Sequence, residues 1–422
     1  MSAHDRVVWI DAARGICVIA VVTMHATLSL YLYHVPEDAA TSFWAWTADA
    51  MTPFRMPGLA MLSGMLLARR IQAGWPAVRA AVANSAWLYV VWLLLFALFA
   101  WEAGASVWTA QLAGGDGFAW EAVLAQLVLP RTVLWYVFAL AVWTALLTSV
   151  RRLPPSVVIG VLVAVSIASR YLAPEDGDAQ IRNVLRYALF FAIGALGAGR
   201  LRAAIDRGDR RLLGAALWVF VGAIAITLFS RSDDVEHVLS APRDAAAGIL
   251  LLLLVARVCR GGRVGTALGW LGRRTLPVYV MHALLFDAVL RYVPGWDAVV
   301  GLPVLDTIGP LVLALAAAAV CVGLYELVMR TPDRVLFGLP GAVRRRLLAA
   351  RTDPAPVERA AGAPQPIGGV VAQPGRLGLD LGEGGRRVAD REHRHREHEP
   401  VRRRVLADAV DQQRPLPAAA ER

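Results

Sequence analysis

The chain has 422 residues, of which 57% are hydrophobic and 18% are charged. Soluble globular proteins average roughly 45–50% apolar and about 25% charged residues, so this composition excludes a water-soluble globule and a disordered protein. The net charge of +10 does not indicate nucleic acid as a partner, because the basic residues are all Arg and mostly flank apolar runs or gather near the C-terminus. The three Cys have no metal-type spacing, so neither a disulfide framework nor a metal site is expected. The class of protein that fits this composition is a polytopic membrane protein.

Ten apolar runs approach the length of about 20 residues that a helix needs to cross a bilayer. The predicted fold class is therefore all-α integral membrane, with about ten transmembrane helices. The predicted spans are 8–30, 44–67, 84–101, 133–149, 156–170, 184–200, 212–229, 244–259, 270–290 and 308–329.

The distribution of Arg predicts how these spans are oriented, because short cytoplasmic loops carry an excess of basic residues. With both termini in the cytoplasm, the inner loops hold more than twice as many Arg as the outer loops. Residues 1–350 are predicted to form one membrane domain. Residues 351–422, rich in Arg, Ala, Gly and Pro, cannot bury enough apolar area to fold, so a disordered cytoplasmic tail is predicted there. The oligomeric state stays open.

The first span carries three ionisable residues, which are costly inside a membrane and mark a candidate functional site. Arg14 and His25 are eleven residues apart, which on a helix leaves about 20° of angular offset and about 16 Å of axial separation. Asp11 falls on the same side of the helix, about 40° from His25. The alternative is that His25 merely packs while Asp11 and Arg14 reach the interface. We favour function for the Arg–His pair and the interface for Asp11.

The second span carries Arg55 near its middle, between Pro53 and Pro57. Proline removes backbone donors and breaks a helix, and a broken helix at membrane depth normally lines a cavity. A guanidinium there needs an anion or a buried carboxylate. Arg55 therefore predicts anion binding, with an ion pair to Asp49 as the structural alternative.

Three further features bear on the site. The ninth span carries Tyr279 and His282, and for His282 a packing role and a substrate contact are equally open. Trp135 at the start of the fourth span indicates an interfacial anchor or a pocket lining. Ser63-Gly64 in the second span predicts close helix packing.

These segments together resemble a known family. The stretches IDAARGICVIAVVTMHA, TPFRMPGLAMLSGMLL, LWYVFALAVWTALL and LGRRTLPVYVMHALLF resemble the membrane-bound acyltransferase 3 family over about residues 5–330. The second stretch matches the family's MP-x-F-x-x-SG pattern except that Gly58-Leu59-Ala60 replaces the usual aromatic run. The W-S-L-x-x-E-E-x-F-Y segment of the larger O-antigen acetylase branch is missing, so the chain resembles the compact branch of sugar O-acetyltransferases and glucan succinyltransferases.

The resemblance implies a membrane-bound O-acyltransferase of the bacterial cytoplasmic (inner) membrane. It would move an acetyl or succinyl group from cytoplasmic acyl-CoA, the donor, to a hydroxyl of a carbohydrate or cell-envelope glycan, and no metal is expected. The family's Arg and His map onto Arg14 and His25, and Arg55 is added as a third candidate catalytic residue. The candidate substrate-binding residues are Asp11, Trp135, Tyr279 and His282.

A mechanism follows from these residue types. Guanidinium groups bind phosphates bidentately, so Arg14 is expected to hold the CoA end while His25 takes the acceptor proton or accepts the acyl group covalently. Arg55 would stabilise the oxyanion or hold the CoA phosphates.

Two other function classes stay open. A proton-coupled small-molecule transporter is the main alternative, because buried His, Arg and Asp with proline-broken helices also suit a carrier. Against it, the sequence shows no internal repeat. A non-catalytic subunit that binds a sugar or a lipid is the other alternative, and it would tolerate loss of His25.

Overall fold

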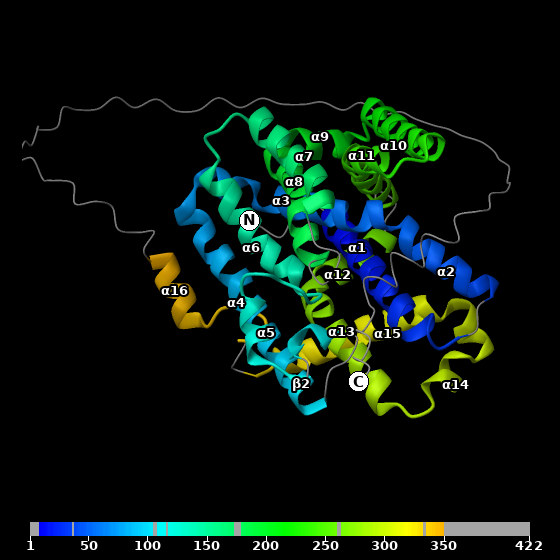
Figure 1. The fold of residues 1–422 in the computed structure, drawn as a ribbon. Coiled ribbons are helices and arrows are strands. Elements are labelled where there is room, and N and C mark those ends of the chain that lie inside the picture. The colour runs from blue at the N-terminus through cyan, green and yellow to red at the C-terminus, as the bar shows by residue number, and fades with distance from the viewer. Residues whose placement is uncertain are drawn as a thin grey trace, which may run out of the picture.

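The computed structural model describes residues 8–35, 38–103, 108–114, 117–172, 179–259, 263–331 and 335–349, which form a bundle of helices (Figure 1). The predicted tail at 351–422 lies outside these residues. The first half of the chain forms α1 (Val8–Ala26), the π-helical turn η2 (Thr27–Tyr31), α2 (Ala39–Ala50), α3 (Thr52–Ala73), α4 (Trp75–Ala103), η3 (Ala110–Leu112), β1 (Ala113–Gly114), β2 (Gly117–Phe118), α5 (Trp120–Ala125) and α6 (Trp135–Ser149). The second half forms α7 (Pro155–Leu172), α8 (Ala179–Leu196), α9 (Ala198–Arg207), α10 (Arg210–Ser230), α11 (Asp233–Cys259), α12 (Arg263–Gly272), α13 (Thr275–Tyr292), α14 (Trp296–Val300), α15 (Pro303–Val328) and α16 (Gly341–Ala349).

Each of the ten predicted spans is helical over most of its length, and the helical architecture is confirmed, although the spans 44–67, 184–200 and 270–290 each cover parts of two helices. The two strands are only two residues each and pair antiparallel in one small hairpin. Five described helices are long and apolar enough to cross a membrane alone: Val8–Tyr31, Trp75–Glu102, Arg210–Ser230, Asp233–Cys259 and Thr307–Val328. The pair α8 and α9, bent by 76°, would make a sixth span. The chain is thus a multi-pass membrane protein, while the count of ten and the cytoplasmic termini stay predictions.

The predicted second span is two helices. α2 ends at Ala50 and α3 begins at Thr52, with Pro53 in the first turn of α3. Proline suits that position because its fixed φ matches the helix and its missing N–H would have no helical partner. The break is therefore confirmed beside Pro53, ahead of Arg55, whereas Pro57 lies inside the continuous helix α3.

α1 ends in the π-helical turn η2, directly after His25. Two hydroxyls bond back to carbonyls of the preceding turn, Thr27 Oγ1 to Thr23 at 2.9 Å and Ser29 Oγ to His25 at 2.6 Å. Such bonds loosen and bend a helix, and π-helical turns are frequent at functional sites.

α1 lies inside the bundle, in contact with α3, α11, α12, α13 and α15 (Figure 1). Small residues allow the closest of these contacts. A Cβ on Gly15 would meet the Gly272 backbone of α12 at 3.1 Å. Gly64 on α3 and Gly194 on α8 likewise leave no room for a Cβ, because each faces backbone atoms of the other helix. The predicted close packing at Gly64 is confirmed.

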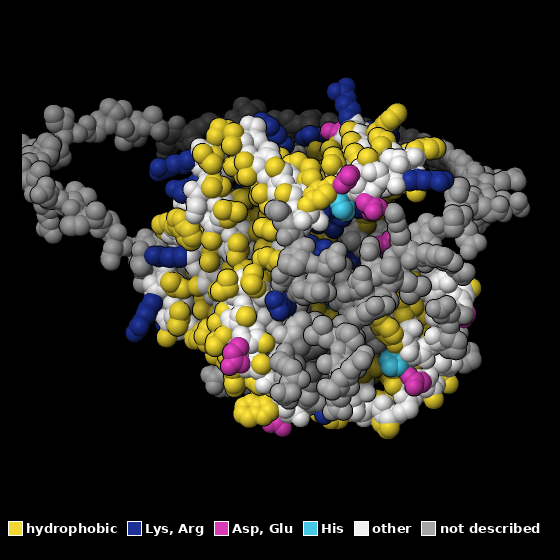
Figure 2. Space-filling view, in the orientation of Figure 1, with side chains coloured by type: hydrophobic (Ala, Val, Ile, Leu, Met, Phe, Trp, Pro, Cys, Tyr) yellow, Lys and Arg dark blue, Asp and Glu magenta, His cyan; other side chains and the backbone are white. Residues whose placement is uncertain are grey.

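Apolar side chains cover much of the outer surface, as expected for a protein whose solvent is lipid. Figure 2 shows them over the part of the surface formed by α4, α6 and α7, with Arg side chains mostly at its edges. On α10 the exposure is extreme: Trp218 is 81% exposed and Phe229 is 90% exposed. The side chains of the predicted functional site lie inside the bundle.

Candidate functional site

The structure brings the two histidines of the predicted spans together. His25 is in the last turn of α1 and His282 is in the middle of α13. Their ring centroids are 5.2 Å apart, with 35° between the ring planes, and His282 is fully buried. The sequence left a packing role and a substrate contact equally open for His282, and the structure places it beside His25.

Hydrogen bonding assigns the tautomer of His282. Its Nδ1 lies 3.0 Å from the Val278 carbonyl. Because a carbonyl can only accept, Nδ1 carries the hydrogen, and in a neutral ring Nε2 carries the lone pair. That Nε2 and the Nδ1 of His25 are both buried without a hydrogen-bond partner among the described residues. A buried polar atom left without a partner costs about 1–3 kcal/mol, so these two nitrogens are candidates for contacts with a bound substrate.

An indole covers one side of His25. The Trp108 ring packs edge-on against the His25 ring, with centroids 4.7 Å apart, and Trp108 is buried. Trp108 lies in the segment between α4 and α5. Further along the chain, Phe118 and Trp120 pack on Trp101 of α4, and Trp120 is 51% exposed.

Arg14 and Asp11 both tie α1 to the chain around the start of α13. Arg14 Nη2 donates a 3.1 Å hydrogen bond to Thr275 Oγ1. The Asp11 carboxylate lies 4.0 Å from Arg273 Nη1, and Asp11 is only 4% exposed. Asp11 is therefore buried against a protein cation, which the interfacial interpretation did not predict.

Arg55 is also buried, at 8% exposure, in the first turn of α3. Its Nη1 donates to the Ala48 carbonyl of α2, and its Nε has no partner among the described residues. Asp49 is not without a partner, so its ion pair with Arg55 stays open as the structural alternative. Anion binding by Arg55 stays a prediction.

Aromatic residues form the wall behind the histidine pair. The Tyr279 hydroxyl donates to the Val133 carbonyl and accepts a 3.3 Å bond from the Tyr136 amide. Tyr136 Oη donates to the Leu59 carbonyl at 3.0 Å and lies 2.9 Å from Ser63 Oγ. Ser63 thus does more than allow close packing. Because the Tyr279 hydroxyl is engaged with backbone, this residue positions the wall, and its ring lies 6.2 Å from that of His282.

Trp135 continues this wall towards α8. It is buried, and its ring stacks on Tyr187 with centroids 5.7 Å apart. Of the two interpretations offered by the sequence, an interfacial anchor does not fit a side chain that is buried among aromatic rings. A pocket lining stays a prediction.

A family model described as an acyltransferase domain matches residues 7–326. The chain belongs to the acyltransferase 3 family. No curated protein and no solved structure matches it significantly. The match begins beside α1 and ends near the end of α15, so the histidine pair, Arg14 and Arg55 all lie inside the acyltransferase 3 domain. Family membership supports a membrane acyltransferase, and the roles of these residues stay predictions.

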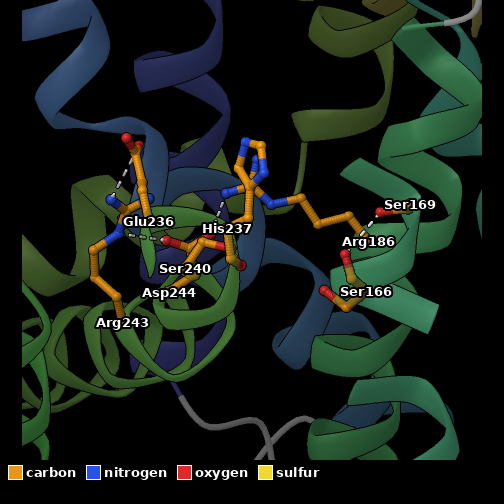
Figure 3. Close-up of polar contacts among 8 residues, drawn as sticks. All are labelled: Ser166, Ser169, Arg186, Glu236, His237, Ser240, Arg243 and Asp244. Atoms are coloured by element: carbon orange, nitrogen blue, oxygen red, sulfur yellow. Dashed lines mark hydrogen bonds and ion pairs between the residues drawn. The ribbon is translucent and has the colours of Figure 1, made fainter. Parts of the chain in front are cut away.

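This acyltransferase 3 domain also holds a charged network that sequence reasoning missed (Figure 3). Arg186 of α8 donates to the Asp244 carboxylate of α11, which is fully buried. Arg243 binds the other Asp244 oxygen at 3.1 Å and lies 3.9 Å from Glu236.

The signal for this network was present in the sequence but lay at predicted span boundaries. Asp244 was the first residue of one predicted span and Arg186 the third residue of another. The helices begin much earlier, α11 at Asp233 and α8 at Ala179. Longer spans would have placed both residues well inside the membrane, where an ionisable residue marks a candidate site.

Proposed function

We propose that this protein is a membrane-bound O-acyltransferase that moves an acyl group, acetyl or succinyl, from cytoplasmic acyl-CoA to a hydroxyl of a carbohydrate or cell-envelope glycan. The proposed location is the bacterial cytoplasmic membrane. Family membership supports acyl transfer by a membrane protein. The donor, the acceptor and the location rest on the sequence resemblance and on the chemistry of the site.

The observation that carries the proposal is the buried contact between His25 and His282. Acyl transfer to a hydroxyl needs a group that removes the hydroxyl proton as the oxygen attacks. A neutral imidazole is such a group, and the His282 ring presents a lone pair 5.2 Å, centroid to centroid, from the His25 ring. Acceptance of a hydrogen bond from His25 by that lone pair would orient His25 and stabilise its protonated form, as the third member of a catalytic triad does.

In the proposed reaction, the acceptor hydroxyl oxygen attacks the thioester carbonyl carbon while His25 takes the hydroxyl proton. The tetrahedral intermediate then collapses, the carbon–sulfur bond breaks, and His25 returns the proton to the CoA thiolate. Arg55, buried at the start of α3, would stabilise the oxyanion. A covalent alternative, in which His25 first accepts the acyl group, uses the same residues and leaves a labelled protein when no acceptor is present.

Arg14 is proposed to bind the CoA part of the donor. It lies eleven residues before His25 on α1, about 16 Å along the helix. A guanidinium stays charged and can bind phosphate with two parallel hydrogen bonds. The phosphates would then stay near the cytoplasmic end of α1 while the pantetheine arm carries the thioester towards His25.

The test uses the full-length protein in nanodiscs, with radiolabelled acetyl-CoA or succinyl-CoA and crude envelope glycans as acceptor. We expect label transfer in the wild type. His25→Ala should lower kcat by roughly 10²- to 10⁴-fold, whereas Arg14→Ala should mainly raise the KM for acyl-CoA.

Full activity in a normally folded His25→Ala protein would rule out the proposed role of His25. If the wild type neither binds acyl-CoA nor turns it over, but moves protons together with a small solute across vesicles, the protein is a transporter and the transferase proposal is wrong.

A further inference from the structure

The short helix α16 (Gly341–Ala349) follows the last long helix, α15, and carries an unbroken run of three Arg, from Arg344 to Arg346. All three side chains are exposed, and they make no ion pair among the described residues. Residues 335–349 contain no Asp or Glu that could neutralise them. α16 therefore presents uncompensated positive charge to its surroundings.

Indole hydrogen bonds hold the chain in front of α16 against α4. Trp87 Nε1 donates to the Val335 carbonyl at 2.8 Å. Trp92 Nε1 donates to the Leu336 carbonyl at 2.8 Å. Because α4 is long and apolar enough to cross a membrane, carbonyls of an irregular segment beside it need such partners. The bonds thus seat the segment before α16 on a membrane-spanning helix.

The contacts of this segment run backwards along α4, towards its first residue, Trp75. Leu336 is bonded to Trp92. Further on, the Leu339 amide donates to Asn84 Oδ1 at 3.0 Å, and Asn84 lies about 12 Å nearer the start of α4 than Trp92 does. α16 comes next and contacts α4. It therefore lies beside the first half of α4.

The neighbouring helices are also basic where α4 begins. α3 ends at Ala73, directly before α4, and Arg69 and Arg70 are exposed near that end. A Cβ on Gly74, between the two helices, would meet the Arg151 guanidinium at 3.1 Å. Figure 2 shows basic side chains at the edge of the molecule where Figure 1 draws α16. This is the end of α4 that the distribution of Arg predicts to face the cytoplasm.

α16 itself is suited to a membrane surface. Val343 and Leu347 are four residues apart and share a face of the helix, and Val343 is 43% exposed. Short helices with apolar residues on one face and Arg on the other bind in the headgroup region of a bilayer. A helix of 9 residues is only marginally stable in water by itself, and residues 341–346 are all exposed. A surface of opposite charge would supply the contacts that the protein does not.

We propose that α16 binds the headgroups of anionic phospholipids at the surface of the membrane that α4 crosses. Each Arg near such a surface favours binding by roughly 5-fold, so the three Arg together favour it by roughly 100-fold. The partner is the lipid surface and not a substrate. The proposal therefore does not depend on the transferase activity and holds equally for a transporter.

Hydrogen exchange of the α16 backbone, followed by mass spectrometry, tests this proposal on the full-length protein. Nanodiscs of phosphatidylcholine alone are compared with nanodiscs that also contain phosphatidylglycerol. We expect the amides of residues 343–349 to exchange roughly 10- to 100-fold more slowly with phosphatidylglycerol, because lipid binding holds the helix folded. High salt should shrink this difference, since salt screens exposed charges.

Variants then separate the charge of α16 from the charge of the whole protein. Replacing its three Arg by Gln (Arg344→Gln, Arg345→Gln and Arg346→Gln) should abolish the difference between the two lipids. Replacing them by Lys should keep it, because the charge is kept. The matched control is the same replacement by Gln at 402–404, the three Arg of a second Val-Arg-Arg-Arg run. It removes equal charge and should keep the difference.

Three results would overturn the proposal. One is equal exchange of wild-type α16 in both kinds of nanodisc. Another is a loss of the difference in the 402–404 control as large as in the α16 variant, because the lipid would then sense only net charge. The third is an equal slowing by inorganic polyphosphate in phosphatidylcholine nanodiscs, which would identify a soluble polyanion as the partner.

Discussion

The histidine pair and the arginine network each have a fully buried member, His282 and Asp244, yet they satisfy their polar atoms in opposite ways. At His25 and His282, two ring nitrogens have no partner among the described residues and the neighbouring groups are aromatic rings. In the network, Asp244 is fully buried and accepts from two guanidinium groups. Neutral imidazoles can stay without partners at modest cost, whereas buried charges cannot.

This difference indicates different tasks. The histidine pair is suited to moving a proton, because a neutral imidazole can both take and return one. The network is suited to holding helices together, because Asp244 of α11 pairs with Arg186 of α8. Substitutions in the network should therefore change stability first, and substitutions at the pair should change activity first.

The largest effect is expected for Asp244→Asn. The substitution keeps the size of the side chain but leaves Arg186 and Arg243 without their shared carboxylate. Removing one partner of a buried ion pair costs about 3–5 kcal/mol. The free energy of unfolding, measured by detergent titration in mixed micelles, should fall by that amount.

Asp234→Asn is the control for Asp244→Asn, because Asp234 lies on the same helix but is exposed. It should change the free energy of unfolding by no more than about 0.5 kcal/mol. Equal stability of the two variants would mean that the network does not hold α8 and α11 together.

A smaller effect, on activity rather than stability, is expected for His282→Phe. Phenylalanine fills nearly the same volume but lacks the Nε2 lone pair beside His25. Loss of a group that orients a catalytic side chain typically costs 10- to 100-fold, and kcat should fall by about that factor while the Tm is retained.

His34→Phe serves as the control, because His34 pairs with Asp297 at the surface, away from the pair. It should keep wild-type kcat. A His282→Phe protein that also kept it would show that His282 only packs.

The smallest effect on stability is expected in the aromatic wall behind the histidine pair. Tyr136→Phe removes the hydroxyl that bonds the Leu59 carbonyl and Ser63, which should lower the free energy of unfolding by about 1 kcal/mol. Tyr33→Phe, at a 60% exposed position, should leave it unchanged. If both variants were unaffected, the hydroxyl contacts of Tyr136 would contribute nothing measurable.

The sequence predicted the helices well because apolar length and proline breaks are local properties. The ten apolar runs all became helices, and the break beside Pro53 was expected from the residue type. The sequence could not predict which helices meet. The contact of His25 with His282 joins the first and thirteenth helices, and no local pattern specifies such a pairing.

Span boundaries limited the prediction of the site. A tabulation of apolar residues begins a span where charge stops, so a charged residue that a helix carries into the bundle falls at the edge of the predicted span and is passed over. Arg186 and Asp244 were lost in this way, whereas Arg14, Arg55 and His25 stood out because apolar residues surround them on both sides. Asp11, near the start of the predicted span 8–30, was predicted to reach the interface and is buried against Arg273 instead.

The edge-on packing of Trp108 against His25 has a consequence for the fate of a bound thioester. A thioester delivered to His25 meets an indole on that side instead of bulk water, and hydrolysis needs a water molecule where the indole stands. An acceptor that arrives from this side has to displace the indole before its hydroxyl can reach the imidazole. In the proposed reaction the donor would then be consumed only when an acceptor is present, and the indole would couple acyl transfer to acceptor binding.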